Sequence, residues 1–316
     1  MLKIFLRKPG LAAKRMIKSA RKTFPVDETG SESCELRQFK NLRISRDPWR
    51  KQLLAVKIRP AFKRLRRLES GLDGNIKNFR TGIGHKNIYA GDHRIGVVVN
   101  HLSREQWLRV ADLVDYIGVM TYDFHGAWDQ NSDFMAAMKL DPSNDPSVTS
   151  QVLSKYNLTD AMNIYLDMGI PSTKLIVGIP MYGRMMNIAQ AGATQGLYQP
   201  VTGTPQGEWD NATGYTGMLN YNCIVDRTTC GNNYNLPNLV LVDPSKNKLG
   251  QYAMTPWGYT DHLFVTYDDE KSAAYKAQWI KQNKFGGAML WDLTSDFPGR
   301  DNRSIVNAVY KEFNKN

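Results

Sequence analysis

The chain has 316 residues, of which 42% are hydrophobic, enough to bury a substantial core as one large domain or as two smaller ones. No stretch approaches the roughly 18 consecutive apolar residues of a membrane-spanning helix, so we expect no membrane-embedded segment. The net charge of +11 is unevenly distributed, because residues 1–95 hold 24 basic and 8 acidic residues, whereas the remainder holds 17 and 22. The second part therefore has the composition of an ordinary, mildly acidic globular protein.

The first 94 residues form a basic, atypical segment. In residues 36–74 Lys and Arg interrupt every apolar helix face, and Pro48 and Pro60 break the stretch further. Three interpretations remain open: a tail that binds nucleic acid, a solvated or poorly ordered extension, which is favoured, and a stretch that is not native to the domain. The apolar run near the N-terminus is shorter than the roughly 7 to 15 residues of a secretory signal core, so no signal peptide is expected.

Strands alternate with helices from about residue 95 onward. Apolar strands are predicted at 95–100, 116–123, 174–184 and 288–296. Helices are predicted at 103–115, at 157–171, within 264–287, where a turn precedes the helix and glycines end it, and at 303–313. Ala273, Ala277 and Ile280 share one face of the third helix. Each strand is apolar throughout, which indicates a parallel sheet covered on both faces, either doubly wound or part of a (β/α)8 barrel.

A long interruption separates the third strand from the elements that precede the fourth. About eighty residues between Arg184 and Phe264 are rich in Gly, Asn, Thr and Tyr. Because a bare loop of this length is rare in a compact domain, we expect an inserted module of short strands and turns. Within it, Cys223 and Cys230 could close a loop in an oxidising compartment; three free thiols, including Cys34, in a reducing compartment are the alternative.

Polar and aromatic side chains follow three of the predicted strands. The ends of parallel strands carry the sites of α/β folds, and these strands end in Tyr122 and Asp123, in Tyr182 and Arg184, and in Trp291 and Asp292. Aromatic faces cover the apolar side of a sugar, while a carboxylate and a guanidinium bind its polar groups. Any one of these aromatics could be core packing, but their recurrence on three strands favours a site for a neutral, hydroxyl-rich ring. His125 and Trp128 are interpreted as loop residues near this cleft.

The sequence from about residue 95 to the end resembles the C-terminal half of a glycoside hydrolase family 18 chitinase. The resemblance rests on "DYIGVMTYDFHGAWD", "KLIVGIPMYGR" and "FVTYDDEKSAAYKAQWIKQNKFGGAMLWDLTSD", which stand in the family's order and spacing. It implies an α/β fold, namely an incomplete TIM (β/α)8 barrel in which strands five to eight are recognisable. It also implies that residues of about 185–263 are the α+β insertion that many of these chitinases carry before the last strand.

The resemblance implies roles for six residues in the cleavage of β-1,4-linked N-acetylglucosamine polymers by a substrate-assisted retaining mechanism. Two have catalytic roles: Tyr122 would hydrogen-bond the acetamido group, and Asp123 would contact the distorted sugar. Four would bind substrate: Tyr182 and Arg184 line the cleft, Trp291 forms its floor, and Met120 packs beneath the sugar. The implied partner is chitin or its oligosaccharides, the implied state is an extracellular monomer, and no cofactor or metal is implied.

One part of the family pattern is missing from the sequence. The family's general acid lies in an Asp-x-x-Asp-x-Asp-x-Glu motif, which does not occur here, and the stretches around Asp73 and at 27–32 lack its spacing. We therefore expect a truncated, weakly active or inactive chitinase with exposed sheet edges. A non-catalytic protein that binds chitin oligosaccharides and a basic-tailed nucleic-acid-binding protein are the alternatives.

Overall fold

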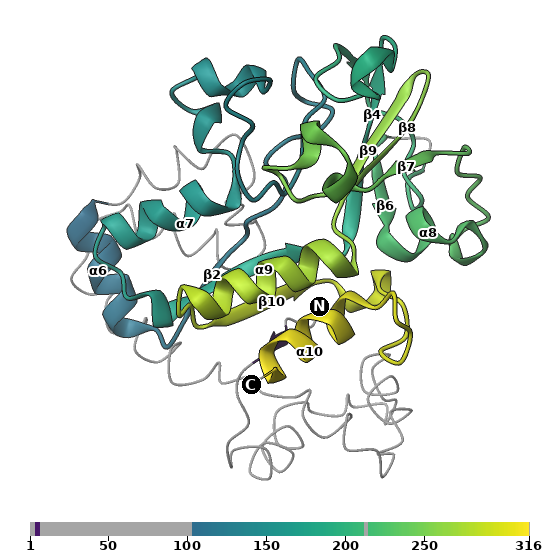
Figure 1. Ribbon diagram of the computed structural model, residues 1–316. Coiled ribbons are helices and arrows are strands. Elements are labelled where there is room, and N and C mark those ends of the chain that lie inside the picture. Colours follow the sequence, from purple (N-terminus) through teal and green to yellow (C-terminus); the bar gives the residue numbers. More distant parts are fainter. Residues whose placement is uncertain (1–3, 7–102, 212–213, 316) are drawn as a thin grey trace, which may run out of the picture.

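The computed structural model describes residues 4–6, 103–211 and 214–315, which form two β-sheets with helices packed against the first (Figure 1). The strand predicted at 95–100 lies outside the described residues. The basic segment at 1–94 also lies outside them apart from residues 4–6, and with it Asp73 and the stretch 27–32. The described residues confirm the predicted α/β class.

The first sheet has the order β1, β10, β3, β2, formed by Ile4–Leu6, Gly287–Trp291, Leu175–Pro180 and Ile117–Val119. β2, β3 and β10 are parallel, as predicted from their apolar sequences. β1 was not predicted and pairs antiparallel with β10, so the expectation of a purely parallel sheet is wrong at this edge. A short edge strand can pair in either direction, because backbone groups alone make the ladder.

β2 is shorter than the strand predicted at 116–123. The Thr121 N–H donates to the Val119 carbonyl oxygen at 3.0 Å, which turns the chain away from the sheet. Tyr122 and Asp123 therefore lie just beyond the strand, on the connection that leaves its carboxyl end.

Four helices of the described residues have side-chain caps at their N-termini, and each confirms a predicted helix. Ser103, Asn157, Asp269 and Ser304 accept hydrogen bonds from backbone N–H groups of the first turns. The helices are α6 (Arg104–Leu113), α7 (Leu158–Asp167), α9 (Glu270–Gln282) and α10 (Ile305–Asn314). Figure 1 shows α9 beside β10, and the predicted face of Ala273, Ala277 and Ile280 is buried in the core that includes β3 and β10.

The second sheet is antiparallel and lies above the first in Figure 1. Its strands are β4 (Tyr182–Ile188), β5 (Val201–Gly203), β6 (Met218–Asn220), β7 (Val240–Val242), β8 (Trp257–Thr260) and β9 (Leu263–Tyr267). The single strand predicted at 174–184 is thus wrong, because the chain leaves the first sheet after Pro180 and pairs Gly183 and Arg184 with β9. The sequence predicted only a turn before the helix in this part of the chain, whereas Leu263–Tyr267 form β9 and supply the partner strand of β4.

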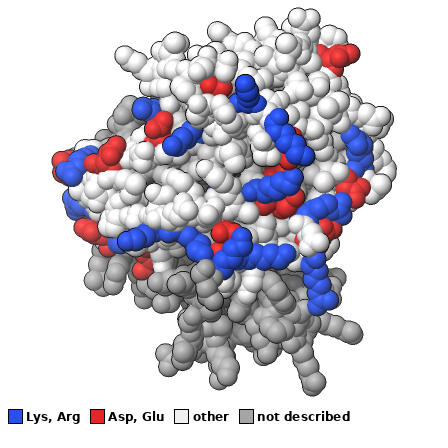
Figure 2. Space-filling view, in the orientation of Figure 1, with Lys and Arg blue, Asp and Glu red and all other residues white. Residues whose placement is uncertain are grey.

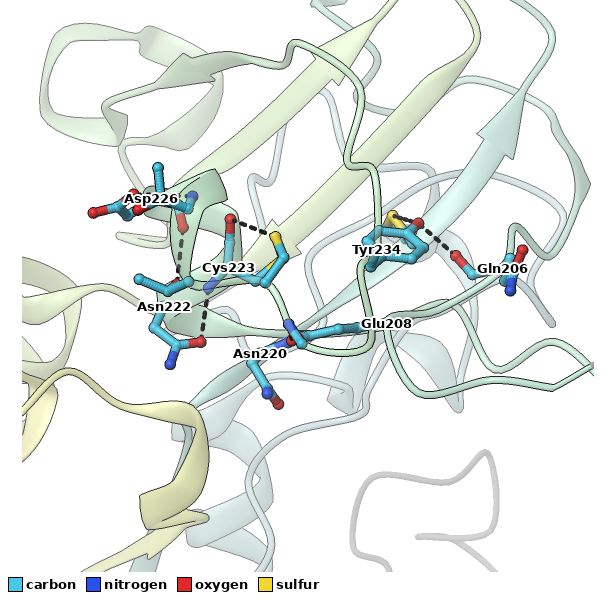
Figure 3. The surroundings of a disulfide bond; sticks show 12 residues. Gln206, Glu208, Asn220, Asn222, Cys223, Asp226 and Tyr234 are labelled. Carbon is cyan, nitrogen blue, oxygen red and sulfur yellow. Dashed lines mark hydrogen bonds between the residues drawn. A yellow bond between two sulfur atoms is a disulfide. The ribbon is translucent and has the colours of Figure 1, made fainter.

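Short helices connect the strands of the described residues. They are α8 (Tyr221–Val225) and the 3-10 turns Pro146–Thr149, Leu153–Lys155, Ser172–Lys174, Gly192–Thr194, Arg227–Thr229, Pro244–Lys246, Lys248–Gly250 and Leu293–Ser295. Cys223 of α8 and Cys230 are joined by a disulfide, which decides between the two alternatives left open by the sequence (Figure 3).

The charges of the described residues are mixed over the surface. Figure 2 shows Lys and Arg side chains in a band over the lower part of the molecule, where Figure 1 places α9 and α10, with acidic side chains beside several of them. Within the described ranges no helix is long and apolar enough to cross a bilayer.

Candidate functional site

The six residues predicted for the site come together where the two sheets meet. Tyr122 and Tyr182 are buried in one cluster with Met135, Ala136, Ile176 and Met289, and Met120, Met218 and Trp291 pack against it. Met120 and Trp291 extend from the ends of β2 and β10, whereas Tyr182 begins β4. Sequence positions up to 171 residues apart therefore share one surface.

An ion pair joins Asp123 to Arg184 at this surface. Arg184 Nε donates to Asp123 Oδ1 at 2.8 Å and Nη2 donates to Oδ2 at 3.0 Å, the two-pronged geometry that fixes both side chains. The Asp123 side chain is 7% exposed and that of Arg184 is 15% exposed. Arg184 Nη1 also donates to the Thr216 carbonyl oxygen at 3.3 Å, so the guanidinium also contacts the segment that leads into β6.

The backbone of Asp123 has an uncommon conformation. Its φ is +57°, in the left-handed region that Asp tolerates better than most residues. Residues held in such conformations concentrate at functional sites, where the surrounding contacts enforce them. Here the Arg184 ion pair is one of those contacts.

The two tyrosines pack edge to face beside the ion pair. Their ring centroids lie 6.0 Å apart with an interplanar angle of 81°. Burial raises the pKa of Tyr182 well above its usual value, and the nearby Asp123 carboxylate raises it further. The Tyr182 phenol therefore stays protonated, and its hydroxyl hydrogen-bonds Asp123.

Trp128 belongs to this site, although the sequence interpretation left it as a loop residue. Its side chain is 42% exposed, and the Arg184 guanidinium carbon lies 5.3 Å from the indole centroid and 5.6 Å from that of Tyr182. The indole also covers Gly126, where a Cβ would come within 2.4 Å of the ring. A glycine two residues before an exposed aromatic, in the loop that carries Asp123, is the signal that could have identified it.

The four glutamates of the described residues make their hydrogen bonds and ion pairs outside this cluster. Glu208 is buried and accepts hydrogen bonds from the N–H groups of Asn220 and Gly231, beside the disulfide (Figure 3). Glu270 accepts from the Tyr221 hydroxyl, Glu312 pairs with Lys315, and Glu105 accepts from the Ser103 hydroxyl at the start of α6. Within the part of the chain that the structure describes, the contacts of the glutamates thus lie away from the cluster.

A cavity of about 430 Å³ opens elsewhere, at the start of α7. Its lining includes Lys139, Asn157 and Asp160, and none of the six predicted residues. We place the candidate site at the cluster, because the aromatic rings of Tyr182 and Trp128 and the Asp123–Arg184 ion pair converge there. No group of three His, Cys, Asp or Glu within the described ranges could hold a metal ion.

Comparisons with known proteins point to one family. Residues 80–296 match the family model described as Glycosyl hydrolases family 18, a range that starts before residue 95. Chitinase A1 of Niallia circulans is 31% identical over 209 residues, covering 64% of this chain and 27% of that protein. The oviduct-specific glycoprotein of Bos taurus is 29% identical over 184 residues, covering 58% of this chain and 29% of that protein. The chain thus spans under a third of the length of these two relatives.

Two solved structures have similar folds. Chitinase ChiA74 from Bacillus thuringiensis superposes with a TM-score of 0.55 and 30% identity, covering 66% of this chain and 34% of that one. Human YKL-39, described as a pseudo-chitinase with retained chitooligosaccharide binding properties, has a TM-score of 0.54 and 25% identity, covering 66% and 53%. Similar chains thus include both an enzyme and a binding protein.

Proposed function

The chain belongs to the glycosyl hydrolases family 18, and from this premise we propose that its site binds chitin oligosaccharides and has little or no hydrolytic activity. The observation that carries the proposal is the Asp123–Arg184 ion pair flanked by the rings of Tyr182 and Trp128. Flat rings match the apolar faces of N-acetylglucosamine units, and the charged pair offers both acceptors and donors to their hydroxyl and amide groups.

Each residue of the site has a proposed role. Tyr122 hydrogen-bonds the acetamido group and Asp123 contacts the distorted sugar, the two positions at which catalysis would be assisted. Tyr182 and Arg184 line the cleft. Trp291 lies beneath one sugar, with Met120 supporting that sugar from the strand end. Trp128 adds an aromatic face that the sequence interpretation did not assign.

The absence of turnover follows from the missing general acid. The substrate-assisted mechanism needs a carboxylic acid that protonates the glycosidic oxygen, and the sequence lacks the family's Asp-x-x-Asp-x-Asp-x-Glu motif. Loss of a positioned acid typically lowers the rate about 10²- to 10⁴-fold. A weakly active chitinase with another carboxylate in this role is the second candidate.

The order of the parallel strands supports a barrel of the kind that the family resemblance implies. We propose that β2, β3 and β10 are strands six to eight of a (β/α)8 barrel, that residues 95–100 contribute the fifth, and that residues of about 185–263 form the α+β insertion beside the cleft. Residues 1–94 are the basic segment of the chain; its last part, 80–94, falls within the range that matches the family. Disulfides persist in oxidising compartments, so the Cys223–Cys230 bond supports an extracellular location, and we propose a monomer.

A fluorescence titration tests the binding proposal, since Trp128 and Trp291 would report a bound sugar. Chitotriose is expected to change tryptophan emission saturably, whereas cellotriose, which lacks acetamido groups, is expected to bind at least about tenfold more weakly. In parallel, incubation with a fluorogenic chito-oligosaccharide is expected to release little or no fluorophore. Absence of a chitotriose response contradicts the proposal, and turnover abolished by replacing one carboxylate supports the weakly active chitinase instead.

Salt-sensitive retention on a heparin column tests the alternative that the chain is a nucleic-acid-binding protein. If chitotriose does not bind and deletion of residues 1–90 abolishes heparin retention, the basic tail is the functional part of the chain.

A further inference from the structure

Charged side chains are buried beside the loop that carries Asp123 and Trp128. His125 follows Asp123 by two residues and is 2% exposed. Its Nδ1 lies 3.2 Å from Asp129 Oδ2, and its Nε2 lies 3.7 Å from Asp133 Oδ2. The imidazole thus lies between two carboxylates, hydrogen-bonded to Asp129 and at ion-pair distance from Asp133, although the proposed sugar contacts leave it without a role.

Asp133 connects the imidazole to a segment that lies 14 residues further along the chain. Ser147 Oγ donates to Asp133 Oδ2 at 3.3 Å, and the Ser147 N–H donates to Asp145 Oδ1 at 2.7 Å. Asp133 and Asp145 are 2% and 6% exposed. The network therefore connects the loop after β2 to the 3-10 turn at 146–149. This connection is made by side-chain contacts and not by pairing of helices or strands.

Asp129 closes the turn that carries Trp128. Its Oδ2 accepts from the Gly126 N–H at 2.9 Å, and its own N–H donates to the Gly126 carbonyl oxygen at 3.0 Å. The Trp128 indole lies on Gly126 within this turn and under the Arg184 guanidinium. The carboxylate that contacts His125 thus also fixes the path of the chain around Trp128.

We propose that His125 is a positioning residue, which bridges Asp129 and Asp133 and thereby holds residues 123–129 in the conformation that directs Asp123 and Trp128 toward Arg184. The consequence for ligand affinity rests on the proposed function, whereas the coupling between the imidazole and the loop does not. A buried histidine that only fills space is the competing explanation.

The charge of the imidazole gives the proposal its pH dependence. Burial by itself lowers the pKa of His125, but the carboxylates of Asp133, Asp129 and Asp145 outweigh it and raise the pKa to about 9. The Tyr156 ring, 5.9 Å away, faces the imidazole from the other side, and Tyr198 and Asp141 lie around the carboxylates. Burial raises the pKa of Asp133 to about 7, so near pH 8 both ring nitrogens carry protons that face carboxylates, and this arrangement is lost when the imidazole deprotonates.

The first experiment compares His125→Gln with His262→Gln in the full chain. His262 is an exposed histidine whose Nδ1 contacts the Ala189 carbonyl oxygen, so it provides a matched control. Wild type is expected to bind chitotriose most tightly near pH 8, between the pKa of Asp133 of about 7 and that of His125 of about 9, and about tenfold more weakly above about pH 9.5. His125→Gln is expected to bind about tenfold more weakly at every pH, and His262→Gln is expected to follow wild type.

The second experiment needs no ligand. NMR of the full chain, with the His125 resonance identified by its loss in His125→Gln, is expected to show the imidazole titrating near pH 9. The Trp128 indole resonance, assigned with Trp128→Phe, is expected to shift with the same midpoint. If His125→Gln does not fold, Asp129→Asn retains the histidine and is expected to lower that midpoint.

These outcomes separate the two proposals. A Trp128 resonance that stays fixed while His125 titrates, or His125→Gln binding with the wild-type pH profile, overturns the positioning role. Failure of wild type to bind chitotriose overturns the proposed function alone, because the NMR experiment still tests the coupling between the imidazole and the loop.

Discussion

The Tyr122 ring lies against Gly178 with no room for a side chain between them. A Cβ at Gly178 would come within 2.7 Å of both Tyr122 Cε1 and the Val119 carbonyl oxygen. The Thr121 hydroxyl also donates to the Gly178 carbonyl oxygen at 2.6 Å, so β3 fixes the residues that follow β2. A residue with no side chain therefore sets the position of the phenol proposed to contact the acetamido group.

Gly178→Ala is expected to displace Tyr122 and weaken both the fold and the site. Because backbone must move to relieve the overlap, we expect a loss of about 1–3 kcal/mol and reduced chitotriose affinity. Thermal denaturation and the fluorescence titration measure the two effects. Gly118→Ala is the control, since a Cβ at Gly118 meets the Met289 sulfur at 3.4 Å, an ordinary contact. Equal effects of the two substitutions would argue against the close-approach explanation.

At the scale of elements, a buried lysine that is ion-paired beside its own helix also ties α9 to the segment around Ala136. Lys276 Nζ lies 2.5 Å from Asp268 Oδ2 and donates to the Ala136 carbonyl oxygen at 2.7 Å, and both side chains are fully buried. Ser272 Oγ donates to the other Asp268 oxygen at 2.7 Å. Since Ala136 belongs to the site cluster, helix α9 helps to position the cluster from behind.

Lys276→Met is expected to destabilise the protein by about 3–5 kcal/mol, because it leaves the Asp268 carboxylate buried without its cation. Lys271→Met is the matched control. Lys271 pairs with Asp243 at 3.1 Å, but its side chain is 69% exposed, so we expect less than about 1 kcal/mol. Chemical denaturation measures both changes. A Lys276→Met variant as stable as Lys271→Met would show that the buried pair does not hold α9 in place.

At the scale of the whole molecule, the buried network around His125 links stability to pH. The folded-state pKa of His125 is about 9, above its ordinary value of 6.5, so its stabilisation is complete below about pH 6.5 and is lost as the pH rises through 9. Burial raises the pKa of Asp133 to about 7, so the folded state also binds this proton more tightly than the unfolded chain does. Both groups make the protein less stable as the pH rises.

We therefore expect the free energy of unfolding to fall by about 3 kcal/mol at most between pH 6.5 and 9.5 through His125. Thermal denaturation across this range measures the effect. His125→Gln should flatten the profile, and His262→Gln should retain it. A wild-type melting temperature that rises over this range would contradict the assignment of the network as a proton-binding one.

The local sequence determined the helices and the chemical character of the site. Caps such as Ser103 and Asp269 and the apolar face of α9 act within a few residues, so their effects are readable along the chain. The resemblance to the family supplied the six site residues in the same way, because a motif preserves local spacing. These features depend on short-range hydrogen bonds and on the period of apolar residues.

Only the tertiary structure decided which sheet each strand joined and which neighbours the site residues acquired. The run at 174–184 is apolar without a break, yet it divides after Pro180 because Gly183 and Arg184 find their hydrogen-bond partners on β9, some eighty residues away. The pairing of Cys223 with Cys230, the stacking of Trp128 under Arg184 and the burial of His125 between carboxylates depend likewise on where the folded backbone brings the side chains. Strand pairing and burial are properties of distant contacts, and a local pattern in the sequence does not encode them.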